Sequence, residues 1–211
     1  IEEENPDSDD QIISENFISI TATNQAEKTM HIAIQIRKMQ REGKIGSATG
    51  LNGLIIQGSP GVGKSEMIGA VLRAENISQG FLDSDIATNQ TSLNQQKFYK
   101  IEAGTSPDKM RQIIIKAYEQ GDIVWIDEIN SCIDNSDLEK ILNATLTGKH
   151  PEGKKEISQK PGFMLISSIN PPILAGRSQL SPALKHRSKV IDLTPLTQYQ
   201  KEDLEKICQN M

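Results

Sequence analysis

The sequence has few cysteines and no long apolar run. Only Cys132 and Cys208 occur among 211 residues, too few for a disulfide framework, so we expect free thiols in a reducing, cytoplasmic compartment. No apolar stretch approaches the ~18 residues of a membrane span, and no charged start leads into an apolar stretch with a cleavage site. These absences exclude a secreted domain stabilised by disulfides and predict an intracellular protein without a membrane segment.

Aromatic and histidine residues are also scarce. Aromatics make up 4% and hydrophobic residues 36% of the chain, so the interior must consist mainly of aliphatic side chains. The three histidines, His31, His150 and His186, share no spacing typical of a metal site, and we read them as surface or structural residues. The length suits one complete α/β core or a core with a small appendage.

Excess negative charge is concentrated at the start of the chain. The formal net charge is −5, from 28 acids against 23 Lys and Arg. Six acids lie within the first ten residues, namely Glu2, Glu3, Glu4, Asp7, Asp9 and Asp10. Without them the balance is +1, which by itself indicates neither a nucleic-acid nor a membrane partner. Residues 1–28 are expected to be an acidic, disordered tail and entry segment, and the Ile1 start suggests a fragment or processed form.

Hydrophobic periodicity predicts strands alternating with helices. A first helix is expected from Thr29 to Arg41, with Ile32, Ile36 and Met39 sharing a face. A long loop or irregular insertion is expected over residues 76–96. The predicted strands span 54–56, 98–101, 123–126, 163–166 and 190–193, and the other helices 66–74, 107–120, 137–146, 181–186 and from 197 onward. This order predicts an α/β fold with a parallel five-stranded sheet covered on both faces.

The stretch GSPGVGKSE, residues 58–66, satisfies G-x-x-x-x-G-K-[ST] and lies between an apolar strand and a helix. In such a loop, backbone N–H groups approach phosphate oxygens. Lys64 can place a positive charge beside the β and γ oxygens, and Ser65 can ligate Mg²⁺. We predict that the whole stretch binds nucleotide: Gly58, Ser59, Pro60, Gly61, Val62, Gly63, Lys64, Ser65 and Glu66.

Two acids end the apolar strand of IVWIDEIN, residues 123–130. A carboxylate at such a strand end, here Asp127, can hold Mg²⁺ through water, and a second one beside it, Glu128, can orient and deprotonate an attacking water. Phosphate loops whose nucleophile is a substrate, or a water held otherwise, need no such second acid. Glu128 therefore favours a hydrolase over a simple nucleotide-binding protein.

These motifs resemble those of the AAA+ ATPases, within the branch of MoxR-type ATPases, midasin and the dynein motor. GSPGVGKS is similar to Walker A and WIDEIN to Walker B. FMLISSINPP, residues 163–172, resembles the sensor 1 strand, and GRSQLSPALKHR, residues 176–187, resembles the segment that ends in the arginine finger. The resemblance covers Thr29 to Leu193 and implies an ATP-binding core over residues 29–195. Residues 196–211 would begin a C-terminal lid that is otherwise absent or truncated.

The resemblance implies a role for each matching position. Lys64 and Ser65 would bind phosphate and Mg²⁺, Asp127 would support Mg²⁺, and Glu128 would be the catalytic base. Asn170 would be sensor 1, holding water or the γ-phosphate, and Arg187 would be the finger, with Arg177 as a second candidate. Asn170 could instead be a turn former before Pro171, and Arg187 a solvated surface charge.

A finger that completes a neighbour's site implies a homo-oligomeric ring, expected to be a hexamer. The function so implied is ATP hydrolysis with Mg²⁺ to remodel a protein partner. Two alternatives stay open: a nucleotide-gated interaction module with little turnover, and a DNA-directed motor or loader on the same fold. The second is motivated by a loop carrying Lys149, Lys154, Lys155 and Lys160, which could meet a polymer substrate or be merely solvated.

Overall fold

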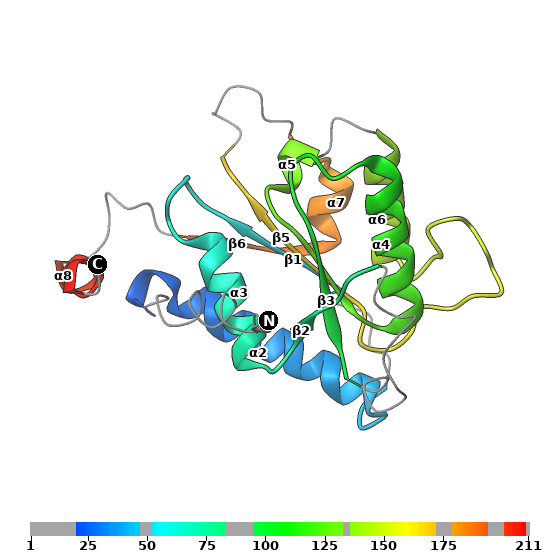
Figure 1. The fold of residues 1–211 in the computed structure, drawn as a ribbon, viewed down its shortest axis with the longest axis horizontal. Coiled ribbons are helices and arrows are strands. Elements are labelled where there is room, and N and C mark those ends of the chain that lie inside the picture. The colour runs from blue at the N-terminus through cyan, green and yellow to red at the C-terminus, as the bar shows by residue number, and fades with distance from the viewer. Residues whose placement is uncertain are drawn as a thin grey trace, which may run out of the picture.

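A six-stranded parallel sheet forms the centre of the computed structural model, which describes residues 20–46, 52–82, 95–132, 136–171, 179–193 and 201–209. The strands are β1 (Gly53–Gln57), β2 (Ser78–Gln79), β3 (Lys97–Ile101), β4 (Ile123–Ile126), β5 (Met164–Ile169) and β6 (Ser188–Asp192), in the order β2-β3-β4-β5-β1-β6 (Figure 1). All five predicted strands are present, and the sixth is the two-residue β2 within the expected loop. Because every neighbouring pair is parallel, β1, β4 and β5 end at the same edge of the sheet.

Helices cover both faces of the sheet (Figure 1). On one face lie α2 (Thr21–Arg41) and α3 (Lys64–Ala74), and on the other α4 (Pro107–Gln120), α6 (Ser136–Leu146) and α7 (Pro182–His186). Two apolar clusters result, and adjacent strand residues join different ones: Ile55 packs with the α4 and α6 side chains, whereas Leu54 and Ile56 pack with those of α2 and α3. This alternation follows from the two-residue period of a strand.

The boundaries of α4 follow directly from its sequence. Ser106 accepts a hydrogen bond from the backbone N–H of Lys109 and Pro107 occupies the first turn. Gly121 ends the helix with φ +74°. A Cβ there would lie 2.3 Å from the carbonyl oxygen of Pro161, so both the backbone conformation and the close approach require glycine.

The helix α2 differs from its prediction in extent and in orientation. It begins at Thr21 rather than Thr29, and the expected core face is the outer one, since Ile32 is 60% and Met39 39% exposed. Met30 and Ile34 are buried instead. The sequence contains two apolar rows around this helix, and the buried row begins before Thr29.

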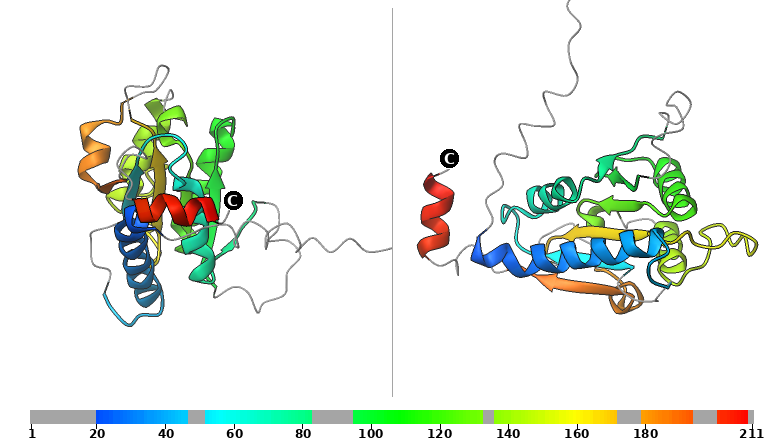
Figure 2. Two further views of the ribbon diagram at one scale, coloured as in Figure 1. Left: turned by 90° about the vertical axis from the view of Figure 1, so that its left-hand side faces the viewer. Right: turned by 90° about the horizontal axis from the view of Figure 1, so that it is seen from below.

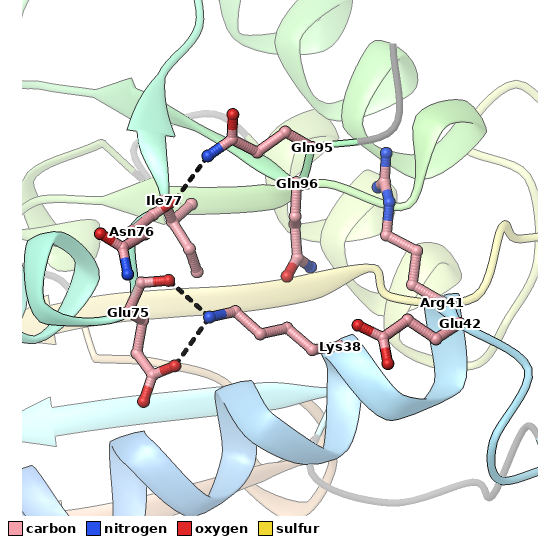
Figure 3. A pocket seen from close by; sticks show the side chains of 8 residues that line it. All are labelled: Lys38, Arg41, Glu42, Glu75, Asn76, Ile77, Gln95 and Gln96. Carbon is pink, nitrogen blue, oxygen red and sulfur yellow. Dashed lines mark hydrogen bonds and ion pairs between the residues drawn. The ribbon is translucent and has the colours of Figure 1, made fainter. Parts of the chain in front are cut away.

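Two polar contacts fix the ends of α2. At its start, the carboxylate of Asp203 in α8 (Lys201–Gln209) accepts hydrogen bonds from the backbone N–H groups of Thr21, at 2.9 Å, and Ala22, at 3.3 Å. These bonds lower the pKa of Asp203. Figures 1 and 2 show α8 beside this end of α2, away from the sheet. Towards its other end, Lys38 pairs with Glu75 just after α3, at 2.8 Å (Figure 3).

Candidate nucleotide-binding site

The glycine-rich loop joins β1 to α3, as the sequence predicts. Gly61 and Gly63 have φ values of +78° and +77°, a conformation that favours glycine. Gly63 precedes the first residue of α3, and no side chain caps this helix. The first backbone N–H groups of the helix are therefore suited to bind an anion such as phosphate.

Lys64 points into this loop and is only 7% exposed. Its Nζ lies 2.9 Å from each of three oxygens: the carbonyls of Gly58 and Ser59, and Oδ1 of Asn170. The ammonium group is thus desolvated and held at the mouth of the loop, where it can meet phosphate oxygens.

Asp127 lies opposite the loop, just after β4. Its carboxylate accepts hydrogen bonds from Ser65 Oγ, at 2.8 and 3.0 Å, and from Ser168 Oγ, at 2.6 Å. A hydroxyl and a carboxylate in contact are the hard oxygen ligands that Mg²⁺ prefers. The described part of the chain contains no group of three or more His, Cys, Asp or Glu able to hold a metal. Any Mg²⁺ here would therefore take its remaining ligands from water and phosphate, as is usual for this ion.

Glu128 adopts φ +51°, in the left-handed region that non-glycine residues rarely occupy. Its backbone N–H donates to Ser168 Oγ at 2.8 Å, and its Oε1 accepts from Asn170 Nδ2 at 2.6 Å. The side chain is half-buried and faces the same space as Lys64. Asn170 therefore bridges the lysine and the glutamate with the two ends of a single amide.

Two residues that sequence reasoning did not single out complete this edge. Asn130 is 1% exposed and donates from Nδ2 to the backbone oxygen of Asn170 at 3.1 Å, which fixes the residue that follows β5. Ser168 contacts both acids. A hint for Asn130 was its place in the Asp-Glu-Ile-Asn run, whereas Ser168 carried no signal beyond being a polar residue in an apolar strand.

Arg187 lies far from this edge within its own chain. It directly precedes β6, whose Ser188 pairs with Gly53 at the amino end of β1, while Gly58 follows the carboxyl end of β1. Five residue steps separate Gly53 from Gly58, or ~16 Å at the rise of a strand. The exposed guanidinium donates to Asn143 Oδ1 on α6 at 2.6 Å. It is not brought together with Lys64 or Glu128.

The other predicted positions are more peripheral. Pro60 and Glu66 are exposed on the loop and on the first turn of α3, and Arg177 lies outside the described residues. The four loop lysines, Lys149, Lys154, Lys155 and Lys160, are exposed, and the loop extends away from the body (Figures 1 and 2). Lys154 pairs with Glu152 at 2.8 Å, so the loop carries charge of both signs.

A polar cavity of about 640 Å³ lies elsewhere, between α2, the end of α3 and the start of β3 (Figure 3). Its lining includes Lys38, Arg41, Glu75, Gln95 and Gln96. The charged groups pair with protein partners: Lys38 with Glu75, and Arg41 with Asp122 at 3.1 Å. These ion pairs explain the charged lining, since one joins α2 to the end of α3 and the other joins α2 to the residue before β4.

A parallel sheet with helices on both faces, a glycine-rich loop between β1 and α3 and two acids after β4 define a P-loop nucleotide-binding fold. The chain belongs to the AAA domain family, dynein-related subfamily, whose model matches residues 53–188. This family lies within the class that the motifs predict. Within the described ranges the sheet has six strands rather than the five predicted.

Solved structures that share the fold include those of PCH-2 and katanin. C. elegans PCH-2 has 16% sequence identity and a TM-score of 0.53, with 90% of this chain and 48% of that chain covered. A structure describing katanin self-assembly has 19% identity and a TM-score of 0.51, with 86% and 52% covered. The chain thus spans about half the length of each. None of the described helices is long and apolar enough to cross a membrane.

Proposed function

We propose that the protein is a Mg²⁺-dependent ATPase that works in a ring to remodel a protein partner. The observation that carries this proposal is the bridge made by Asn170 between Lys64 and Glu128, at 2.9 and 2.6 Å. It brings a phosphate-binding cation, a polar amide and a potential base around one space. Simple nucleotide binding requires the lysine but not the glutamate beside it.

Each residue has a distinct task in this account. Loop N–H groups and Lys64 bind the phosphates, and Asn170 turns its amide from the lysine towards the attacking water or the γ-phosphate. Glu128 accepts the proton from that water, and its fixed backbone aims the carboxylate. Bound Mg²⁺, held by Ser65 and through water by Asp127, would neutralise phosphate charge.

Arg187 supports an assembly of several subunits, which we propose is a hexameric ring. Arg187 lies at the amino end of β6, at the opposite end of the sheet from the phosphate loop. Its guanidinium therefore does not reach the phosphate loop of its own subunit. An arginine supplied by a neighbour can stabilise charge in the transition state. The structural likeness to katanin, whose solved structure concerns self-assembly, is compatible with this arrangement.

The proposals for the client and the cellular setting rest on the charge of one loop and on the state of the thiols. The mixed charge of the loop at residues 149–160 favours a protein client over the nucleic-acid alternative, which calls for a continuous basic surface. Free thiols at Cys132 and Cys208 support a reducing, cytoplasmic compartment. The order Asp127-Glu128-Ile129-Asn130 supports a place near the MoxR and midasin branch.

Replacing Glu128 with Gln tests the hydrolytic function. The variant keeps the size of the side chain but removes the base, so ATP should bind within about threefold of the wild-type affinity while phosphate release falls about 100-fold or more. Titration calorimetry and a phosphate-release assay measure the two quantities. Glu42→Gln, which changes an exposed acid paired with the exposed Lys44, is the matched control. Wild-type turnover in Glu128→Gln, or binding without turnover in the wild type, contradicts the proposal.

A further inference from the structure

Ser168 is a buried hydroxyl that contacts both candidate acids. It is fully buried on β5 and donates its proton to Asp127 Oδ1 at 2.6 Å. The same oxygen accepts the backbone N–H of Glu128 at 2.8 Å. The hydroxyl thus uses its single donor on Asp127 and one of its two acceptor sites on Glu128.

The two acids need such a partner for different reasons. Both oxygens of the Asp127 carboxylate lie within hydrogen-bond distance of Ser65 Oγ, and the bond from Ser168 to Oδ1 fixes the rotation of that carboxylate. Glu128 has a backbone with φ +51°, a left-handed conformation that is unfavourable for a non-glycine residue. The bond to its N–H offsets that cost.

We propose that Ser168 is a positioning residue. It fixes the orientation of the Mg²⁺-facing carboxylate, Asp127, relative to the catalytic base, Glu128. It acts through Asp127 and Glu128 and touches neither nucleotide nor water itself. This inference deepens the proposed function and rests on it.

The chain contains a matched control one residue away. Ser167 is also fully buried on β5, and because strand side chains alternate, it faces the opposite side of the sheet. Its hydroxyl has no hydrogen-bond partner within the described ranges. Removing the Ser167 hydroxyl should therefore have little effect on the site. Removing the Ser168 hydroxyl leaves the N–H of Glu128 without a partner and Asp127 without the bond that orients it.

The test compares Ser168→Ala with Ser167→Ala by two readouts. The first is the affinity for a fluorescent ATP analogue with and without Mg²⁺. In Ser168→Ala, the Mg²⁺-free affinity should match that of Ser167→Ala, while the gain in affinity on adding Mg²⁺ should fall about tenfold, since partners that orient metal ligands have effects of this size. The second is kcat, which should fall about tenfold or more.

Ser168→Cys replaces the oxygen with a somewhat larger sulfur that forms weaker hydrogen bonds, so it should behave as Ser168→Ala. It also serves as the test variant if the alanine variant does not fold. Equal Mg²⁺ gains in the Ser168 and Ser167 variants overturn the inference, whatever the turnover. A wild type that binds Mg²⁺ and nucleotide but releases no phosphate contradicts the proposed ATPase instead, and the binding comparison still decides the role of Ser168.

Discussion

At the scale of residues, the candidate site depends on one amide. Asn170 accepts from Lys64 with its oxygen and donates to Glu128 with its nitrogen, so it pairs with a cation and an anion at once. An aspartate of the same shape could serve the lysine but would repel the glutamate. This explains in physical terms why an asparagine, rather than an acid, suits the end of β5.

The two thiols of the chain should differ in reactivity. Burial, with Asp127 and Glu128 nearby, raises the pKa of Cys132, whereas Cys208 on α8 is exposed. Since the thiolate is the nucleophile, Cys132 should react about tenfold more slowly with iodoacetamide at mildly alkaline pH. Labelling of Cys208→Ser and Cys132→Ser, each with one remaining thiol, measures the two rates separately. Similar rates in the two variants would contradict the buried, acid-flanked setting of Cys132.

At the scale of elements, α2 is attached to α3 by one carboxylate. Glu75 accepts bonds from His31, Gln35 and Lys38, all on α2. Burial alone would raise the pKa of Glu75, but the bonds and charges of His31 and Lys38 outweigh it, and the pKa is lowered. A lowered folded pKa means that this contribution to stability is present above the unfolded pKa of ~4.3 and is lost as pH falls through the folded pKa.

Replacing Lys38 with Met tests this attachment. The variant should lower the free energy of unfolding at neutral pH by about 1.5–3 kcal/mol, the range for hydrogen bonds to charged groups. The difference from wild type should shrink in acid, where Glu75 becomes protonated. Urea titrations at both pH values measure it. Lys44→Met, which removes an exposed pair with Glu42, should change stability by no more than about 1 kcal/mol, and an equal loss in both variants would refute the prediction.

The features predicted from sequence are those set by neighbouring residues. The phosphate loop, the pair Asp127 and Glu128, and the two ends of α4 each depend on a few consecutive positions. The roles of Asn130 and Ser168 depend on the parallel register of β4 and β5, and the buried face of α2 depends on which of two apolar rows meets the sheet. Sequence spacing alone does not determine such choices.

At the scale of the whole molecule, the two halves of the proposed active site lie at opposite ends of β1. The phosphate loop follows its last residue, and Arg187 precedes the strand paired with its first. The exposed guanidinium of Arg187 donates to Asn143 Oδ1 on α6 at 2.6 Å. In the proposed ring, one subunit therefore carries a nucleotide site and a finger that cannot serve each other.

The central claim, a site shared between subunits, is tested most directly by mixing two inactive variants. Glu128→Gln lacks the base but keeps Arg187, and Arg187→Ala lacks the finger but keeps Glu128. Each alone should bind ATP and release phosphate at a small fraction of the wild-type rate. Mixed in equal amounts, they should regain turnover, because some Arg187→Ala sites would then face an intact finger. Wild-type turnover in Arg187→Ala alone, or a mixture as inactive as its two components while the wild type is active, would contradict the account.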